Sequence, residues 1–446
     1  MVYETILAKK VNPVKAIAVS FLVIILIGTV LLMMPFSSRE HKATTFPDAL
    51  FTATSATTVT GLVVKDTHDY YSPTGHIIIL ALIQIGGLGY MTLMSFLFIF
   101  GRNMKLAGGV YLQESMNLPS IGDVYKFARN TAAFVMLFEL LGAFALFLTW
   151  KGSMGISAAI KYGAFHSIAA FNNSGFDLFG GFNSLASQAT NVGVNLTIML
   201  LTITGGIGFI VMNELIQKLK NRRQKLSTHT KLVLATTAIL ILAGTAAFFA
   251  LEKNNAITNL SLPQQIMASA FQSVNARSSG FNTVPFGGLR TATMLLLAAL
   301  MFIGSSPGGT GGGIKTTTAA IAIKSLIAFA RGKTDVELFD RRLSSGALVK
   351  AFATISAAAI LVIVASAAIS VIEPVPYEKI LFETVSAFGT VGLSTGITQQ
   401  LALASRLILI GVMFIGRIGP LAMLHLALAQ KRTQLVRLPE EDVPVG

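Results

Sequence analysis

The chain has 446 residues, of which 53% are hydrophobic and only 12% are charged. A soluble protein would carry about twice that charged fraction, so the composition excludes an ordinary soluble enzyme. The sequence contains no cysteine, which also excludes disulfides and thiolate metal sites. The apolar residues form blocks long enough to span a bilayer, and we predict a multi-pass membrane protein.

The first apolar block follows a basic N-terminus and covers residues 16–36. It is long for the core of a signal peptide and lacks an Ala-x-Ala-like end, so we predict a retained first span. A short apolar segment follows at 46–57, where Pro47 and Asp48 suit the first turn of a helix. A loop ending in Gly61 and a long span at 76–100 complete this unit.

The order of span, short helix, glycine loop and span occurs four times. The later copies are predicted at 131–150, 158–170, Gly175 and 192–216; at 232–251, 262–272, Gly280 and 291–330; and at 347–372, 377–387, Gly392 and 403–429. The loop glycines lie roughly 110 residues apart, as expected for internal repeats. We predict an all-α integral membrane protein of four parallel span–re-entrant pore loop–span repeats, with eight spans around a pseudo-fourfold central pore.

A second motif has the same period. The later span of each unit carries a small-residue cluster, at Ile85–Gly89, Thr204–Gly208, Ile303–Pro307 and Ile415–Gly419. Glycine is common in membrane helices because it permits close packing, so a single cluster would mean little. A chance origin would require two independent motifs to repeat with the same period. We therefore predict repeats at residues 1–100, 101–220, 221–330 and 331–430, followed by a cytoplasmic tail at 431–446.

Two crossings per unit return every copy to the same orientation, so all four loops enter from one face. This differs from the inverted repeats of many secondary transporters. Most Lys and Arg residues lie in segments on the opposite side, which by the positive-inside rule is cytoplasmic. We predict a cell-membrane protein with both termini in the cytoplasm. The basic cluster at Lys218–Lys225 also suits anionic lipid or an acidic partner.

The loops suit a dehydrated cation. A short helix aimed inward brings the negative end of its dipole toward the axis, and glycine tolerates the dihedral angles that direct carbonyls toward an ion. The alternative is four ordinary turns with C-cap glycines. The predicted filter residues are Val59, Thr60, Gly61, Asn173, Ser174, Gly175, Ser278, Ser279, Gly280, Thr390, Val391 and Gly392. No acidic ring accompanies them, which favours a monovalent over a divalent ion.

The third copy has a broken second span. Residues 304–318 contain too many glycines, with Pro307, to hold a regular helix, and such a break needs a water-filled cavity beside it. We predict a gate just inside the filter, formed by Gly308, Gly309, Thr310, Gly311, Gly312, Gly313, Lys315 and Arg417. A phosphate-binding loop is the competing interpretation, but Ile314 separates Gly313 from Lys315, where that motif needs them adjacent.

Two arginines lie near these elements. Arg417 falls inside a span, where a charge is costly, so we expect it to face the pore. There it would repel permeating cations or hold the Gly308–Gly313 loop by its carbonyls; the alternative is a structural pairing with a carboxylate such as Glu214. Arg277 lies three residues before Gly280 and either braces its loop through carbonyl hydrogen bonds or lies on the vestibule rim.

Together these motifs resemble the Trk/Ktr/HKT superfamily of potassium transporters, and most closely its KtrB branch of bacterial membrane subunits. The resemblance covers nearly the whole chain and rests on the segments 55–62, 386–393 and 414–420 together with the broken span. It implies a potassium pore in each chain, a homodimer, and a cytoplasmic KtrA-like nucleotide-binding ring that gates it. Nucleotide would then bind only the partner. Gly61 at the first filter favours potassium over sodium within this superfamily.

Three functional hypotheses follow. The first is a potassium pore, with sodium as a candidate activator, and the second is a sodium-selective or unselective monovalent cation pore on the same scaffold. The third is a pump, which needs an ATPase motif or a chain of intramembrane carboxylates, and the sequence offers neither. We predict no enzymatic activity and no nucleic-acid partner.

Overall fold

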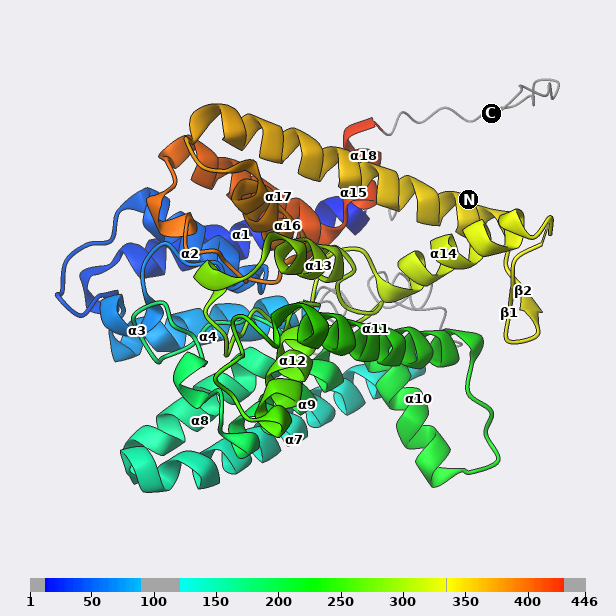
Figure 1. The fold of residues 1–446 in the computed structure, drawn as a ribbon. Helices are drawn as coiled ribbons and strands as arrows, with labels where there is room; N and C mark the ends of the chain where they lie inside the picture. Colours follow the sequence, from blue (N-terminus) through cyan, green and yellow to red (C-terminus); the bar gives the residue numbers. More distant parts are fainter. Residues whose placement is uncertain (1–12, 90–120, 334, 429–446) are drawn as a thin grey trace, which may run out of the picture.

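The computed structural model describes residues 13–89, 121–333 and 335–428, which are predominantly helical (Figure 1). The helices are α1 (Pro13–Met33), α2 (Phe46–Thr57), α3 (Thr67–Tyr70), α4 (Pro73–Gly87), α7 (Ile121–Met154), α8 (Ile156–Phe171), α9 (Val192–Gly206), α10 (Phe209–Lys220), α11 (Thr228–Glu252), α12 (Leu262–Asn275), α13 (Thr291–Phe302), α14 (Thr316–Ala330), α15 (Ser345–Ile372), α16 (Tyr377–Gly389), α17 (Leu403–Ile418) and α18 (Pro420–Leu428). A short antiparallel hairpin pairs β1 (Glu337–Leu338) with β2 (Arg341–Arg342).

The first span of each predicted unit is a long apolar helix. Helices α1, α7, α11 and α15 are each long and apolar enough to cross a membrane. Side-chain caps define where two of them begin: Ser227 accepts a hydrogen bond from the Thr230 amide before α11, and Ser344 accepts one from the Ala347 amide before α15. These four predicted spans are confirmed as helices of spanning length.

The short helices before the loops are also present. Helices α2, α8, α12 and α16 have 12 to 16 residues, which is shorter than a bilayer requires. Pro47 lies in the first turn of α2, and Ser261 and Gln264 form a capping box at the start of α12. Each helix ends immediately before one of the four glycine loops.

The later spans differ from the prediction in two copies. The sequence predicts continuous helices at 192–216 and 403–429, but α9 and α10 meet at 100° and α17 and α18 meet at 98°. Gly208 and Gly419 cause the bends, because their φ angles of 95° and 107° break the helical backbone. Pro420 adds to the second break, since it lacks the amide hydrogen that would continue α17.

The break predicted in the third copy is confirmed, because an irregular segment separates α13 from α14. In the first copy, α4 covers the start of the predicted 76–100 span, and the remainder lies outside the described residues. Within the described part of the chain, four helices qualify as spans, or six if each bent pair is one span. The eight spans, the fourfold repeat and the domain boundaries stay predictions.

The core lies in two apolar clusters that each cross between units. One cluster comes mainly from α11–α17 and includes Phe51 and Leu62 from the first unit. The other comes mainly from α1–α9 and includes Phe271 and Phe281 from the third. In Figure 1, α10 and the β hairpin lie toward one end of the helices and α3 toward the other. The basic ends of α10 and of the hairpin segment thus share a side.

Glycines let the later spans approach the ends of the short helices. A Cβ at Gly86 would collide with the Thr57 carbonyl, and one at Gly205 would collide with the Phe171 carbonyl. A Cβ at Gly416 would likewise collide with the Phe388 carbonyl. The glycine clusters in the sequence are therefore contact points that fix where each short helix ends.

Gly416→Ala should destabilise the protein, because the new methyl group meets the backbone of Phe388 and the helices must separate. Overpacking of this kind costs about 1–3 kcal/mol, so the thermal unfolding midpoint of the purified protein should fall. Gly411→Ala is the matched control, since Gly411 lies in the same helix with nothing within 4 Å. If both variants unfold at the same temperature, the close contact has no role in stability.

Candidate functional site: four glycine loops and a folded-back loop

The four glycine loops meet one another in a closed ring. A Cβ built on Gly61 would lie 3.3 Å from the Cα of Gly175, and one built on Gly175 would lie 3.1 Å from the Cα of Gly280. The contact continues from Gly280 to Gly392 at 3.1 Å and from Gly392 back to Gly61 at 2.9 Å. We call the pairs Thr60–Gly61, Ser174–Gly175, Ser279–Gly280 and Val391–Gly392 the loop ring.

Each glycine of the loop ring gives space to a carbonyl oxygen of the next loop. The oxygens nearest to the missing side chains belong to Thr60, Ser174, Ser279 and Val391. All four residues are buried, and none of these carbonyls accepts a hydrogen bond from a described residue. Buried carbonyls normally have a partner, so this ring presents four unsatisfied acceptors within one small space.

Each loop has at least one residue in the left-handed backbone conformation. The four ring glycines have φ between 68° and 92°. Val59, Asn173 and Thr390, two residues earlier, also have positive φ, whereas Ser278 in the third loop does not. In the first, second and fourth loops the residue before the glycine donates to a carbonyl five residues back, with Thr60 N to Ser55 O at 2.7 Å as an example. These bonds anchor each loop to its short helix.

Residues 303–315 fold back against the loop ring, and we call them the folded-back loop. The Gly312 amide donates to Thr390 Oγ1 at 2.8 Å, and the Asn173 side-chain amide and Thr310 Oγ1 form a hydrogen bond of 2.7 Å. Thr390 and Asn173 each lie two residues before a ring glycine, so the folded-back loop contacts two of the four glycine loops directly.

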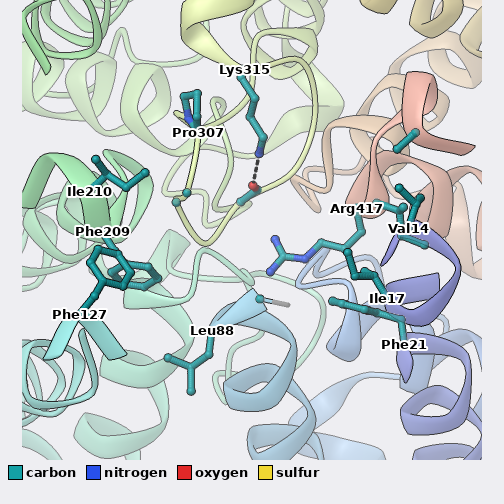
Figure 2. Close-up of a pocket in the computed structure, with 16 residues that line it drawn as sticks. Val14, Ile17, Phe21, Leu88, Phe127, Phe209, Ile210, Pro307, Lys315 and Arg417 are labelled. Carbon is teal, nitrogen blue, oxygen red and sulfur yellow. Dashed lines mark hydrogen bonds between the residues drawn. The ribbon is translucent and has the colours of Figure 1, made fainter. Parts of the chain in front are cut away.

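The bends of the later spans hold the folded-back loop. The Ser306 amide donates to Gly206 O at 2.9 Å, and the Thr310 amide donates to Gly205 O at 3.1 Å. The Gly313 amide donates to Gly416 O at 3.4 Å. The Lys315 ammonium donates to the Gly311 carbonyl at 2.7 Å within the loop, as Figure 2 shows.

Arg417 joins the folded-back loop to the first unit. Its guanidinium donates to the carbonyls of Thr310, Gly86 and Gly87, the last at 3.3 Å. The alternative partner Glu214 is wrong, because that carboxylate accepts hydrogen bonds from Ser227 and Thr230 instead. Arg417 thus lies beside the folded-back loop and holds it through the Thr310 carbonyl.

Below the folded-back loop lies a cavity of about 380 Å³, which we call the inner cavity. Its lining includes Lys315, Arg417 and glycines of the folded-back loop, and Figure 2 shows the two cations among the apolar side chains. Its walls include Ile17 and Phe21 of α1 and Phe209 of α10. A broken span beside a cavity is what the sequence predicts.

Arg277 is buried, with 5% of its surface exposed, so the predicted position on a vestibule rim is wrong. Its Nε has no hydrogen-bond partner among the described residues, and the predicted bracing of carbonyls is not seen either.

Asp177 lies two residues after the second ring glycine. Desolvation, with Asp66 and Asp69 nearby, raises the pKa of its carboxyl group to about 7.

Two polar contacts that support the ring were not predicted. Arg406 donates to Asp48 Oδ1 at 2.8 Å and to the carbonyls of Leu401 and Gln399, which joins the fourth unit to the first. The buried Glu383 accepts four hydrogen bonds from Ser394, Thr395 and Thr398, just after Gly392. Asp48 and Arg406 are distant in sequence, and Glu383 lies in an apolar helix with no motif to mark it.

Comparison with known proteins defines the class. The model of the TrkH family, described as cation transport protein, matches residues 7–433. The chain therefore belongs to this family of membrane cation transport proteins.

Individual relatives cover nearly the whole chain. The Ktr system potassium uptake protein B of Bacillus subtilis is 40% identical over 98% of this chain and 97% of its own length. The potassium/sodium uptake protein NtpJ of Enterococcus hirae is 35% identical over 98% of both chains. The structure of the potassium transporter TrkH from Vibrio parahaemolyticus superposes with a TM-score of 0.70 over 92% of this chain and 85% of that chain, at 19% identity, which supports the fold alone.

The carboxylate of Glu383 should hold the segment after the fourth ring glycine. Glu383→Gln replaces one acceptor oxygen with an NH₂ donor, so the hydrogen bonds that this oxygen accepts from the 394–398 segment are lost. Amide hydrogen exchange across 391–400 should therefore rise roughly tenfold or more. Mass spectrometry of the exchanged protein measures this.

Glu252→Gln is the matched control. Glu252 is equally buried and accepts from Asn255, Ala256, Arg290 and Thr293, away from the loop ring. It should raise exchange near residue 290 and leave 391–400 unchanged. Equal protection of 391–400 in the wild type and Glu383→Gln would show that the carboxylate does not hold this segment.

Proposed function

We propose that this protein carries potassium across the cell membrane through the loop ring. The observation that carries the proposal is the set of four buried carbonyls, at Thr60, Ser174, Ser279 and Val391, that lack hydrogen-bond donors among the described residues. A dehydrated cation centred between them would replace those donors, as carbonyl rings do in potassium-selective filters.

The helix dipoles and oxygen atoms around the loop ring favour binding of a cation. Helices α2, α8, α12 and α16 each end at the ring, so the negative ends of four helix dipoles face it. Ring-forming residues offer carbonyl and hydroxyl oxygens but no carboxylate, which suits a weakly hydrated monovalent ion better than a divalent one. Relatives named for potassium uptake and for potassium/sodium uptake agree with this ion class.

The folded-back loop is the proposed gate. It lies between the loop ring and the inner cavity, and it is held by hydrogen bonds from Arg417 and to Thr390. An ion that leaves the ring toward the cavity must pass it, so the loop has to move for conduction. Its glycines permit that change at low steric cost.

We infer further that gating depends on partners. The name of the Ktr system relatives implies a regulatory subunit, and the resemblance implies a homodimer with a KtrA-like nucleotide-binding ring in the cytoplasm. Basic residues on α10 and on the hairpin segment lie toward one end of the helices, where such a ring would dock if both termini are cytoplasmic.

Ion-replacement flux through the purified protein in liposomes tests the function. Potassium influx should exceed sodium influx severalfold, because carbonyl rings of this type favour the more weakly hydrated ion. The potassium/sodium relative makes a less selective pore the second candidate. Equal fluxes would favour that candidate, and no flux of either ion with a co-expressed regulatory subunit would reject both.

Gly392→Ser should loosen the preference for potassium, because the new side chain meets the Thr60 carbonyl and distorts the ring. Gly396→Ser is the matched control: its φ of 89° is close to the 92° of Gly392, but nothing lies within 4 Å of its Cβ position. Growth of uptake-deficient cells at low potassium, with and without added sodium, measures the change. Unaltered uptake affinity in Gly392→Ser would contradict the assignment of the filter.

A further inference from the structure

The inner cavity is lined by two cationic side chains and otherwise by apolar residues and glycines. The cations are Lys315 and Arg417, which both donate to carbonyls of the folded-back loop and both line the cavity (Figure 2). The guanidinium carbon of Arg417 also lies 6.0 Å from the centre of the Phe21 ring. Ile17, Phe21, Phe209 and Ile210 lie along the walls. One cavity thus brings two cations next to apolar side chains, which is the combination that an anionic amphiphile requires.

The two cations have no anionic partner in the described part of the chain. Every described ion pair involves other lysines and arginines, such as Lys65 and Arg406 with Asp48. Lys315 and Arg417 donate instead to neutral carbonyl and hydroxyl oxygens. Two half-buried positive charges thus face one apolar cavity without a compensating carboxylate, and an anion there would lower their energy.

Both side chains retain free donors. An ammonium group has three N–H bonds and a guanidinium has five. Lys315 uses two and Arg417 uses three in the bonds described above. Their remaining N–H groups are available to the oxygens of a carboxylate or phosphate head group, which forms stronger hydrogen bonds with cations than a neutral oxygen does.

We propose that the inner cavity binds a single-chain anionic amphiphile, with its head group on Lys315 and Arg417 and its tail along α1 and α10. The volume of the inner cavity, about 380 Å³, is near the lower end of the range for ligand pockets, which is roughly 300–1,000 Å³. A volume at the lower end of that range suits one acyl chain better than two. Occupancy would fix the folded-back loop in place and block ion passage; this consequence rests on the function proposed above.

Equilibrium binding of radiolabelled decanoate to the full chain in phosphatidylcholine nanodiscs tests the site, with empty nanodiscs subtracted. Decanoate should bind at one site per chain, and decanol and decyltrimethylammonium should compete at least roughly tenfold more weakly, because neither supplies an acceptor anion. Equal competition by all three would show membrane partition only and would overturn the proposal.

Variants separate the head-group contacts from the tail contacts. Lys315→Gln and Arg417→Gln should each weaken decanoate binding roughly tenfold, whereas Lys324→Gln, on the exposed face of α14, should not. Ile17→Trp should fill the cavity and abolish binding, whereas Leu26→Trp, exposed on the same helix, should not. Size-exclusion profiles and thermal unfolding confirm that each variant is folded. Unchanged affinity in folded Lys315→Gln and Ile17→Trp would reject the site.

A two-chain anionic lipid is the competing occupant. Replacing phosphatidylcholine by phosphatidylglycerol in the nanodiscs should leave decanoate affinity within about twofold if only one chain fits; strong competition would assign the cavity to phospholipid and overturn the single-chain proposal. Binding is measured without an ion gradient, so the binding proposal can fail while the proposed potassium flux is intact.

If decanoate inhibits potassium flux in the wild type but not in Ile17→Trp, the result would connect amphiphile binding to ion transport.

Discussion

The close approach of backbone to backbone at glycine is the constraint on which this structure depends. In the loop ring, a neighbouring carbonyl occupies the place of each missing Cβ, so any side chain at Gly61, Gly175, Gly280 or Gly392 would open the ring. Outside the loop ring, Gly86, Gly205 and Gly416 give the same kind of space to the ends of short helices. The loops converge because the helices behind them are held close by the same means.

The same contacts couple the ring to the folded-back loop. Thr390 has a positive φ and accepts a hydrogen bond from the Gly312 amide, while Asn173 has a positive φ and is hydrogen-bonded to Thr310. These two residues therefore belong to both elements. A movement of the folded-back loop removes hydrogen bonds from two glycine loops, so a change in the gate would also change how firmly the ring is held.

The sequence predicted the elements that depend on local pattern, and it did not predict contacts between distant segments. Apolar length located the four first spans, and composition located the break in the third unit. The bends at Gly208 and Gly419 were missed because a glycine inside an apolar run fits both a packed helix and a sharp turn. The Arg406–Asp48 pair was missed because it joins the fourth unit to the first. The bonds to Glu383 lie within the fourth unit and were missed because no motif marks a carboxylate in an apolar helix.

The placement of charge explains how the proposed closed state would hold potassium back in two ways. Arg417 binds the carbonyls of Thr310 and Gly86, which fixes the folded-back loop across the way out of the ring. Because no described carboxylate pairs with it, its charge, together with that of Lys315, also repels a cation approaching from the cavity. A steric barrier and an electrostatic barrier thus rest on the same bonds, and breaking them would weaken both together. In the proposed gate, this coupling would make the folded-back loop respond as a unit to an anion in the cavity or to a partner that moves the ends of the helices.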